Sequence, residues 1–184
     1  MFTDRRRFIT PLLAALMLVV LSLAVSACGS SDDSREVEEG EVVKVGGLKY
    51  SVVFSRYLNP NDNEDAAYLK GLEPAQNEHN YFGVFIQVKN PTHETLGLVN
   101  ELTITDADGQ KFEAIENESE FAFPLGGEVT ENEWVPELDT TASSGPIQGS
   151  VVIFELPEEV SANRPLLLHI PGPPKESGIV KLDL

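Results

Sequence analysis

Short runs in which apolar and polar residues alternate with a period of two dominate the chain from Val42 onward. Successive side chains of a β-strand point to opposite faces, so this alternation predicts strands with one buried face. The run Val151–Phe154 is apolar at every position and predicts a strand covered on both faces. The alternating runs are Leu48–Ser55, Phe82–Lys89, Glu101–Thr105, Leu166–Ile170 and Val180–Leu184.

Turn signals separate these runs. The sequence Asp106-Ala107-Asp108-Gly109 predicts a hairpin that joins Glu101–Thr105 to a strand at Lys111–Ile115. Helical periodicity is confined to short turns, around Glu64–Lys70 and Pro157–Ala162. About seven or eight short strands with turns between them predict an all-β fold, an antiparallel immunoglobulin-like β-sandwich.

The N-terminal segment has the anatomy of a secretory signal. Arg5, Arg6 and Arg7 precede an apolar run that ends in small residues at Ala27 and is followed at once by Cys28, the chain's single cysteine. The segment therefore predicts a signal peptide over residues 1–27. A permanent transmembrane helix is the alternative, because about 20 apolar residues can span a bilayer.

The sequence Val25-Ser26-Ala27-Cys28 resembles the lipobox of bacterial lipoproteins. The resemblance implies cleavage between Ala27 and Cys28 and a diacylglyceryl group on the Cys28 sulfur, which would anchor the chain to the outer face of the bacterial cell membrane. An ordinary cleavage site followed by a coincidental cysteine is the alternative. Several acyl chains hold a protein on a membrane more firmly than one.

The residues Arg5, Arg6 and Phe8 also resemble a twin-arginine export motif, although Asp4 departs from its pattern. A generic positive region before an apolar segment is the alternative. The resemblance implies export of an already folded domain, and the choice between the two export routes stays open.

The chain is strongly acidic. It has 13 Lys and Arg against 30 Asp and Glu, a net charge of −17; residues 1–27 hold three Arg and one Asp, so their removal leaves a more acidic remainder. This acidity argues against nucleic acids as partners, because their phosphates need Lys and Arg, and it also argues against direct docking on anionic lipid headgroups. The acidity suits either plain solubility or a basic partner or cation. Residues 28–41 are polar and acidic and predict a disordered tether, which leaves residues 42–184 as the sandwich domain.

Three segments of this domain carry a resemblance to a known family. They are Tyr81–Asn90, Leu102–Phe112, which includes the hairpin Asp106–Gly109, and Gly149–Pro157. Together they resemble the telokin-like (immunoglobulin-like) domain of bacterial lipoproteins, and the architecture is similar to that of the immunoprotective extracellular antigen of mycobacteria. The resemblance implies an extracellular antiparallel sandwich with no established activity and transfers no functional residue.

Two long irregular segments, Asn59–Asn80 and Glu116–Pro146, are predicted to be the functional loops, because loops of this length usually carry function. Their aromatic residues are predicted to contact a partner, an envelope protein or a wall component. The alternative is that these aromatics close the open ends of the sandwich. They are Tyr68, Phe121, Phe123 and Trp134.

Chemistry-bearing patterns are few. Asp62, Glu64 and Asp65 place oxygen ligands in one loop and are weak calcium candidates, because calcium takes six to eight oxygens; an Asn/Asp-rich turn is the alternative. No nucleophile elbow or paired histidines occur, so no enzyme activity, cofactor or other metal is expected. The sequence therefore predicts a cell-surface lipoprotein that acts as a non-catalytic binding module. The alternative is an envelope lipoprotein that binds calcium or a small ligand.

Overall fold

The computed structural model describes residues 33–174 and 176–183. The predicted lipidation, cleavage and export residues Cys28, Ala27, Arg5, Arg6 and Phe8 lie outside these ranges. Within the described ranges, no helix combines the length and the apolar character needed to cross a membrane.

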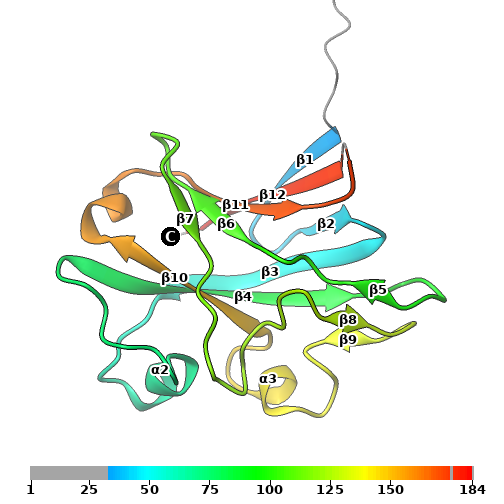
Figure 1. Ribbon diagram of the computed structural model, residues 1–184, viewed down its shortest axis with the longest axis horizontal. Coiled ribbons are helices and arrows are strands. Elements are labelled where there is room, and N and C mark those ends of the chain that lie inside the picture. The colour runs from blue at the N-terminus through cyan, green and yellow to red at the C-terminus, as the bar shows by residue number, and fades with distance from the viewer. Residues whose placement is uncertain (1–32, 175, 184) are drawn as a thin grey trace, which may run out of the picture. The chain divides into compact units, whose positions relative to one another are not determined.

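Two five-stranded sheets and one short strand pair make up the described domain (Figure 1). The first sheet has the order β1-β12-β11-β6-β7, and the second has the order β10-β4-β3-β2 with β9 paired to β4. The pair is β5 with β8. The strands are β1 (Asp33–Glu38), β2 (Val42–Val45), β3 (Leu48–Tyr57), β4 (His79–Lys89), β5 (Leu96–Gly97), β6 (Thr103–Thr105), β7 (Lys111–Glu113), β8 (Glu128–Val129), β9 (Trp134–Val135), β10 (Ser150–Pro157), β11 (Leu166–Pro171) and β12 (Glu176–Leu182).

The predicted all-β sandwich is confirmed. It has more strands than predicted, and three of them, β5, β8 and β9, are only two residues long. The predicted hairpin also forms, since β6 and β7 pair antiparallel around Asp106–Gly109. Both predicted helical turns exist, as α2 (Asn63–Tyr68) and the 3-10 helix η2 (Glu158–Ala162). A further short helix, α3 (Thr141–Ser144), lies inside the second long segment.

Apolar side chains fill two separate cores. The main core lies between the sheets and takes the inward faces of β2, β3, β4, β10, β11 and β12. A second, smaller core covers part of the outer face of the second sheet, where Phe85, Val151 and Ile153 pack against Tyr68 of α2 and its neighbours. The central strands β4 and β10 are therefore buried on both faces, which confirms the prediction for Val151–Phe154.

The predicted disorder of residues 28–41 is wrong for the described part of that segment, because residues 33–38 form β1. This strand pairs parallel with β12 and makes the edge of the first sheet (Figure 1). Val37 packs against the main core. Next to the strand, the Glu39 carboxylate accepts hydrogen bonds from the Ser55 amide (3.1 Å), the Ser55 hydroxyl (2.5 Å) and the Asp183 amide (3.1 Å). The polar composition of the segment gave no signal for this strand, because backbone pairing with β12 and the hydrogen bonds of the Glu39 carboxylate hold it, with Val37 as its one apolar contact to the main core.

Candidate functional site

The segment between β3 and β4 builds one end of the sandwich and begins with the helix α2. Asp62 is the N-cap residue, and its carboxylate accepts hydrogen bonds from the amides of Glu64 (2.9 Å) and Asp65 (3.3 Å). A carboxylate in this position satisfies amide groups that have no partner in the first helical turn. Asp62 is thus used as a helix cap.

Asp65 is buried, with 3% of its surface exposed, and binds Arg56 of β3. The two guanidinium nitrogens lie 2.8 Å and 2.5 Å from the two carboxylate oxygens, and the Asn59 amide donates a third hydrogen bond at 2.7 Å. Burial raises the pKa of Asp65, but the hydrogen bonds from Arg56 and Asn59 and the charge of Arg56 outweigh it and leave the pKa below its ordinary value. The carboxylate is ionised and fully engaged.

Glu64 completes this cluster. Its carboxylate accepts a hydrogen bond from the Tyr68 hydroxyl (3.1 Å) and lies 3.9 Å from the Arg56 guanidinium. Burial, with a further contribution from Glu64, raises the pKa of Tyr68 to about 12. The calcium prediction for Asp62, Glu64 and Asp65 is wrong in its geometry, because the three carboxylates bind backbone amides, a guanidinium and a phenol. Over the described residues, no three His, Cys, Asp or Glu side chains are grouped to hold a metal ion.

Of the four predicted partner-binding aromatics, Tyr68 and Phe123 are buried and Phe121 is partly buried. The Tyr68 ring lies edge-on to Phe85 and to Phe121, with ring centroids 5.0 Å apart in both pairs. Phe123 belongs to the main core. Tyr68 and Phe123 are buried, so little of either ring is left to contact a partner, whereas the contact predicted for the half-buried Phe121 stays a prediction. Tyr68 and Phe121 pack in the second core and Phe123 in the main core, which differs from the alternative that the aromatics close the open ends of the sandwich. Trp134, the fourth, is exposed over 37% of its surface.

An apolar hollow of about 460 Å³ lies beside α2, at the end of the sandwich where β3 ends and β4 begins. Tyr81 lines one wall of it, and the Tyr81 hydroxyl donates a hydrogen bond to the Glu73 carbonyl (2.7 Å). Most of the lining is aliphatic or proline: Leu58, Pro60, Ala66, Leu69, Leu72, Pro74 and Ala75. The sequence signal was an apolar and proline-rich stretch directly after the helix, which period-two patterns do not detect.

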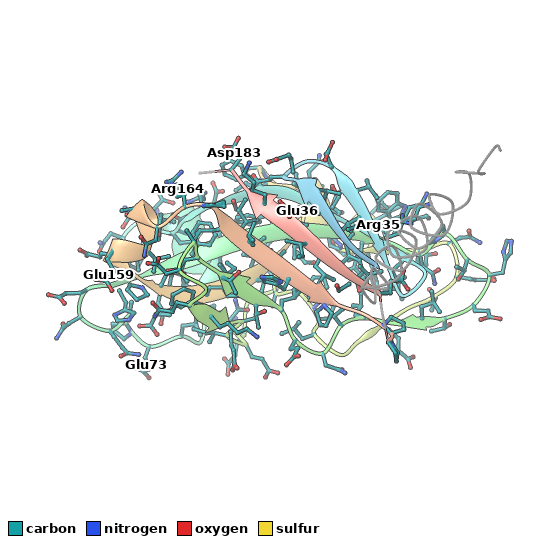
Figure 2. The ribbon with its side chains drawn as sticks, turned by 90° about the horizontal axis from the view of Figure 1, so that it is seen from above. Arg35, Glu36, Glu73, Glu159, Arg164 and Asp183 are labelled. Carbon is teal, nitrogen blue, oxygen red and sulfur yellow. The ribbon has the colours of Figure 1, made fainter. Side chains whose placement is uncertain are left out.

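Two acidic residues lie at this hollow, whose lining also includes His79 and Asn80. Glu73 is one of its lining residues, and the Glu155 carboxylate accepts a hydrogen bond from the Gln76 amide at 2.6 Å. Burial is the main cause of the raised pKa of Tyr81, and the negative charges of Glu155 and Glu73 add to it. Figure 2 shows Glu73 and Glu159 at this end, Glu36 near the middle of the molecule and Arg35 on its other side. The hollow thus combines an apolar floor with a negative rim.

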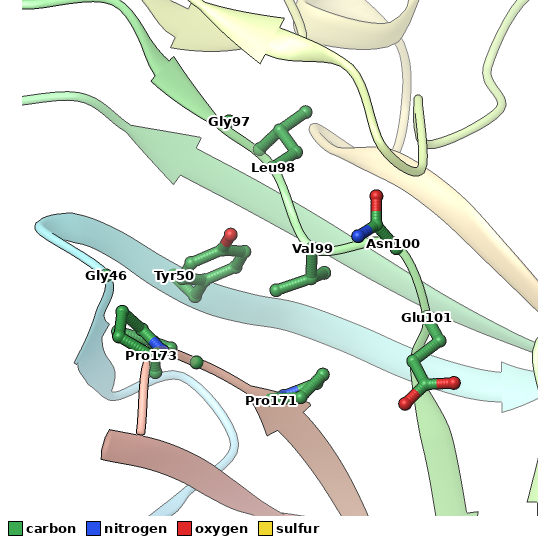
Figure 3. Close-up of a pocket in the computed structure, with 11 residues that line it drawn as sticks. Gly46, Tyr50, Gly97, Leu98, Val99, Asn100, Glu101, Pro171 and Pro173 are labelled. Atoms are coloured by element: carbon green, nitrogen blue, oxygen red, sulfur yellow. The ribbon is translucent and has the colours of Figure 1, made fainter. Parts of the chain in front are cut away.

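A second hollow, of about 510 Å³, opens between the sheets at the other end of the sandwich. Figure 3 shows Tyr50 with its hydroxyl toward the segment of Leu98 and Val99, and Pro171 and Pro173 on another wall. Burial raises the pKa of Tyr50 to about 12, against a smaller opposite effect of a hydrogen bond with the Val99 backbone. The Tyr50 hydroxyl therefore stays protonated at neutral pH.

A third, smaller hollow of about 380 Å³ surrounds Trp134. Its carboxylates come from Glu128, Glu133 and Glu137. The Lys89 ammonium lies 5.0 Å from the centroid of the Trp134 ring, a cation–π arrangement. Of the four predicted aromatics, Trp134 is the one that the structure leaves exposed rather than buried or half-buried.

Comparison with known proteins supports the fold. No family model matches the sequence, and no curated protein matches it. The chain is similar to the crystal structure of MPT63, a secreted protein from Mycobacterium tuberculosis, with a TM-score of 0.53 and 8% identity over 80% of this chain and 97% of that one. It is similar to the yjhA protein from Bacillus subtilis, with a TM-score of 0.52 and 12% identity over 79% and 99% of the two chains. A functionally unknown protein from Listeria monocytogenes has a TM-score of 0.51 and 9% identity over 78% and 82%.

These similarities establish a β-sandwich fold that is shared with bacterial proteins, one of them secreted. At this level of identity they carry the fold alone, because one fold hosts many functions. The resemblance to the telokin-like domain of bacterial lipoproteins remains a prediction. Function has to be argued from the surfaces described above.

Proposed function

We propose that this chain is a lipid-anchored, non-catalytic binding module on the outer face of the bacterial cell membrane. The lipid is attached to Cys28 after removal of residues 1–27, and the module binds a basic protein partner of the envelope. The lipobox-like sequence ending at Cys28 supports the anchor. The observation that carries the binding role is the apolar hollow beside α2 with its acidic rim.

A hollow of this kind suits an apolar side chain flanked by Lys or Arg. Its aliphatic lining would exclude water from the inserted side chain, which is the main favourable contribution at the centre of an interface. The carboxylates of Glu73 and Glu155 lie at the rim, where charge mainly sets the association rate and the choice of partner. The Arg56–Asp65 pair fixes α2 to β3 and so keeps one wall of the hollow in place.

The test is crosslinking of the full-length chain in its native cells, followed by affinity isolation and mass spectrometry. Ala75→Arg fills the hollow and reverses its charge preference, and Gln110→Arg adds the same charge at an exposed position of the β6–β7 hairpin as the matched control. One dominant partner that is lost with Ala75→Arg and kept with Gln110→Arg is the expected result. An unchanged set of partners in both variants would contradict the assigned surface.

The anchor is tested separately by the mass of the mature chain. The proposal expects an N-terminal fragment that begins at Cys28 and carries the mass of acyl chains, and it expects Cys28→Ala to lose both features. A fragment without acyl mass would contradict the anchor and leave the binding surface to be judged by crosslinking alone.

A second candidate function is binding of a small, mainly apolar ligand in the hollow between the sheets (Figure 3). Its volume of about 510 Å³ and the protonated Tyr50 hydroxyl favour this function, because such pockets pair apolar walls with a few polar groups. Native mass spectrometry of the purified chain checks it. A bound small molecule that is absent from a Val99→Trp variant would support the function, and an empty chain in both would contradict it.

A further inference from the structure

Three lysines and a tryptophan form one row across four neighbouring strands of the second sheet. Lys44 of β2 is paired with Lys49 of β3, Lys49 with Lys89 of β4, and Lys89 with Trp134 of β9. Residues paired in this way point to the same face, and neighbouring strands lie about 4.8 Å apart. The next residues in these strands, such as Val45 and Leu48, belong to the main core, so the row faces outward.

The pairing of lysine with lysine in this row is unfavourable for a β-sheet. Like charges placed directly opposite each other destabilise a strand pair, and natural sequences usually place opposite charges there. Within the described residues, no carboxylate lies within 4.0 Å of any of the three ammonium groups. The Lys89 ammonium instead donates to the Asn132 carbonyl and lies over Trp134.

The concentration of positive charge is unusual for this chain. The whole protein has a net charge of −17, yet this one row holds three of the nine Lys and Arg of the described residues. Local rules are broken most often where function requires it. The row is therefore a candidate for binding something negatively charged.

The position of the row indicates which anion. Lys44 and Lys49 flank the turn at Gly46 and Gly47, and a Cβ added at Gly46 would lie 3.5 Å from Pro173 in the turn before β12. The first residue of β12, Glu176, is paired with Asp33. The row thus lies at the end of the sandwich where β1 begins, only five residues after Cys28 in the sequence.

Five residues reach at most about 17 Å, because an extended chain spans about 3.4 Å per residue. The lipid anchor on Cys28 is part of the function proposed above, and this inference rests on it. With lipid on Cys28, the end of the sandwich that carries the row lies close to the membrane surface. We infer that the row of Lys44, Lys49 and Lys89 docks the domain on anionic phospholipid headgroups, so that the hollow beside α2 points away from the membrane.

The overall acidity of the chain does not oppose this contact. The acidic end of the sandwich is separated from the row by the length of β3, about 30 Å for ten residues. Surface charges are screened over about 8 Å at physiological ionic strength, so local charge decides the contact. Three of the nearer acids, Glu128, Glu133 and Glu137, surround Trp134 at the far end of the row, and Glu101 lines the hollow between the sheets together with Gly46. The basic part of the row is therefore its β2–β4 part.

Lysine footprinting tests the contact directly. The full-length chain purified from membranes is added to vesicles of phosphatidylcholine alone or mixed with phosphatidylglycerol, and amine acetylation of each lysine is followed by mass spectrometry. Lys44 and Lys49 are expected to react several-fold more slowly on the anionic vesicles, on the order of fivefold per lysine that contacts the surface. The exposed Lys70 and Lys111 are internal controls and should react at the same rate on both.

A matched pair of variants completes the test. Trp134 is the only tryptophan of the chain, so acrylamide quenching of its fluorescence reports this row alone. K44Q/K49Q should abolish the difference in quenching between the two vesicle types, and K70Q/K111Q should keep it. Equal lysine rates on both vesicles, equal protection of all lysines, or protection by a soluble polyanion and not by vesicles would each overturn the inference. The acyl mass on Cys28 is read from the same sample, and the vesicle comparison holds with or without it.

Discussion

Arg56 and Asp65 form a two-point contact that joins the second sheet to the segment between β3 and β4. Both guanidinium terminal nitrogens face the carboxylate oxygens, at 2.8 Å and 2.5 Å, and the acid is almost fully buried while the Arg56 side chain is 29% exposed. Bidentate pairs of this type are stronger and more directional than single hydrogen bonds. The contact holds α2 against the sheet and thereby shapes the apolar hollow beside it.

Asp65→Asn is expected to lower the free energy of unfolding at neutral pH by about 2 kcal/mol, since it leaves a partly buried guanidinium without its charge partner. The pKa of Asp65 is lowered in the folded state, so its contribution is present above about pH 4 and is lost as the pH falls further. The variant should therefore show a flatter fall of Tm below pH 4 than the unmodified chain. Asp62→Asn is the control, because asparagine is an equally good helix cap. An unchanged Tm of Asp65→Asn at neutral pH would contradict this role.

Tyr57→Phe is expected to leave stability unchanged or slightly increased. The Tyr57 hydroxyl is buried and has no hydrogen-bond partner among the described residues, whereas the ring packs edge-on against Phe82 with centroids 5.1 Å apart. Removal of an unpaired buried hydroxyl loses no bond. Tyr81→Phe is the matched comparison and should cost about 1 kcal/mol, because it removes the hydrogen bond to the Glu73 carbonyl. Urea unfolding of both variants measures the difference, and a larger loss for Tyr57→Phe would refute the assignment.

Glu39→Ala is expected to loosen β1. The Glu39 carboxylate receives three hydrogen bonds, from the amide and hydroxyl of Ser55 and from the Asp183 amide. Hydrogen exchange should become faster for the amides of residues 35–38 and stay unchanged in β4, which lies in the centre of its sheet. Glu38→Ala removes only an exposed ion pair with Lys181 and should have little effect. Equal exchange in the two variants would show that backbone pairing alone holds the strand.

Gly178→Ala is expected to destabilise the sandwich by about 1 to 3 kcal/mol, the usual cost of overpacking. A Cβ at this position of β12 would lie 2.9 Å from a methyl group of Val43 and 3.0 Å from one of Val45, both in the main core. Gly97→Ala is the control, because a Cβ there meets nothing within 4 Å. Thermal unfolding measures both. A Tm that falls equally in the two variants would show that the close approach of β12 to β2 does not matter.

The strands with clear alternation, the hairpin at Asp106–Gly109 and both helical turns could be predicted from the sequence. Each depends on neighbours along the chain, namely the period of the side chains and the chemistry of turn residues. The two-residue strands β5, β8 and β9 could not be predicted, because each exists only through its partner strand. The same holds for β1, whose partner β12 lies at the other end of the chain.

The candidate site shows the same division. The sequence showed Asp62, Glu64 and Asp65 as an acidic cluster. It did not show that Arg56, nine positions from Asp65, forms the ion pair with the Asp65 carboxylate in the fold. The aromatic residues were recognised as unassigned surface, and only their packing separates the buried Tyr68 from the exposed Trp134.

The sequence by itself determined the strand pattern, the acidity of the chain and the resemblance of its N-terminus to a lipoprotein signal, because these are properties of composition and local order. Only the tertiary structure decided which carboxylates are engaged, which aromatics are covered, and that Lys44, Lys49 and Lys89 lie in one row. The reason is register: cross-strand pairing joins residues of the row that are up to 45 positions apart in the sequence, and no local pattern encodes that pairing.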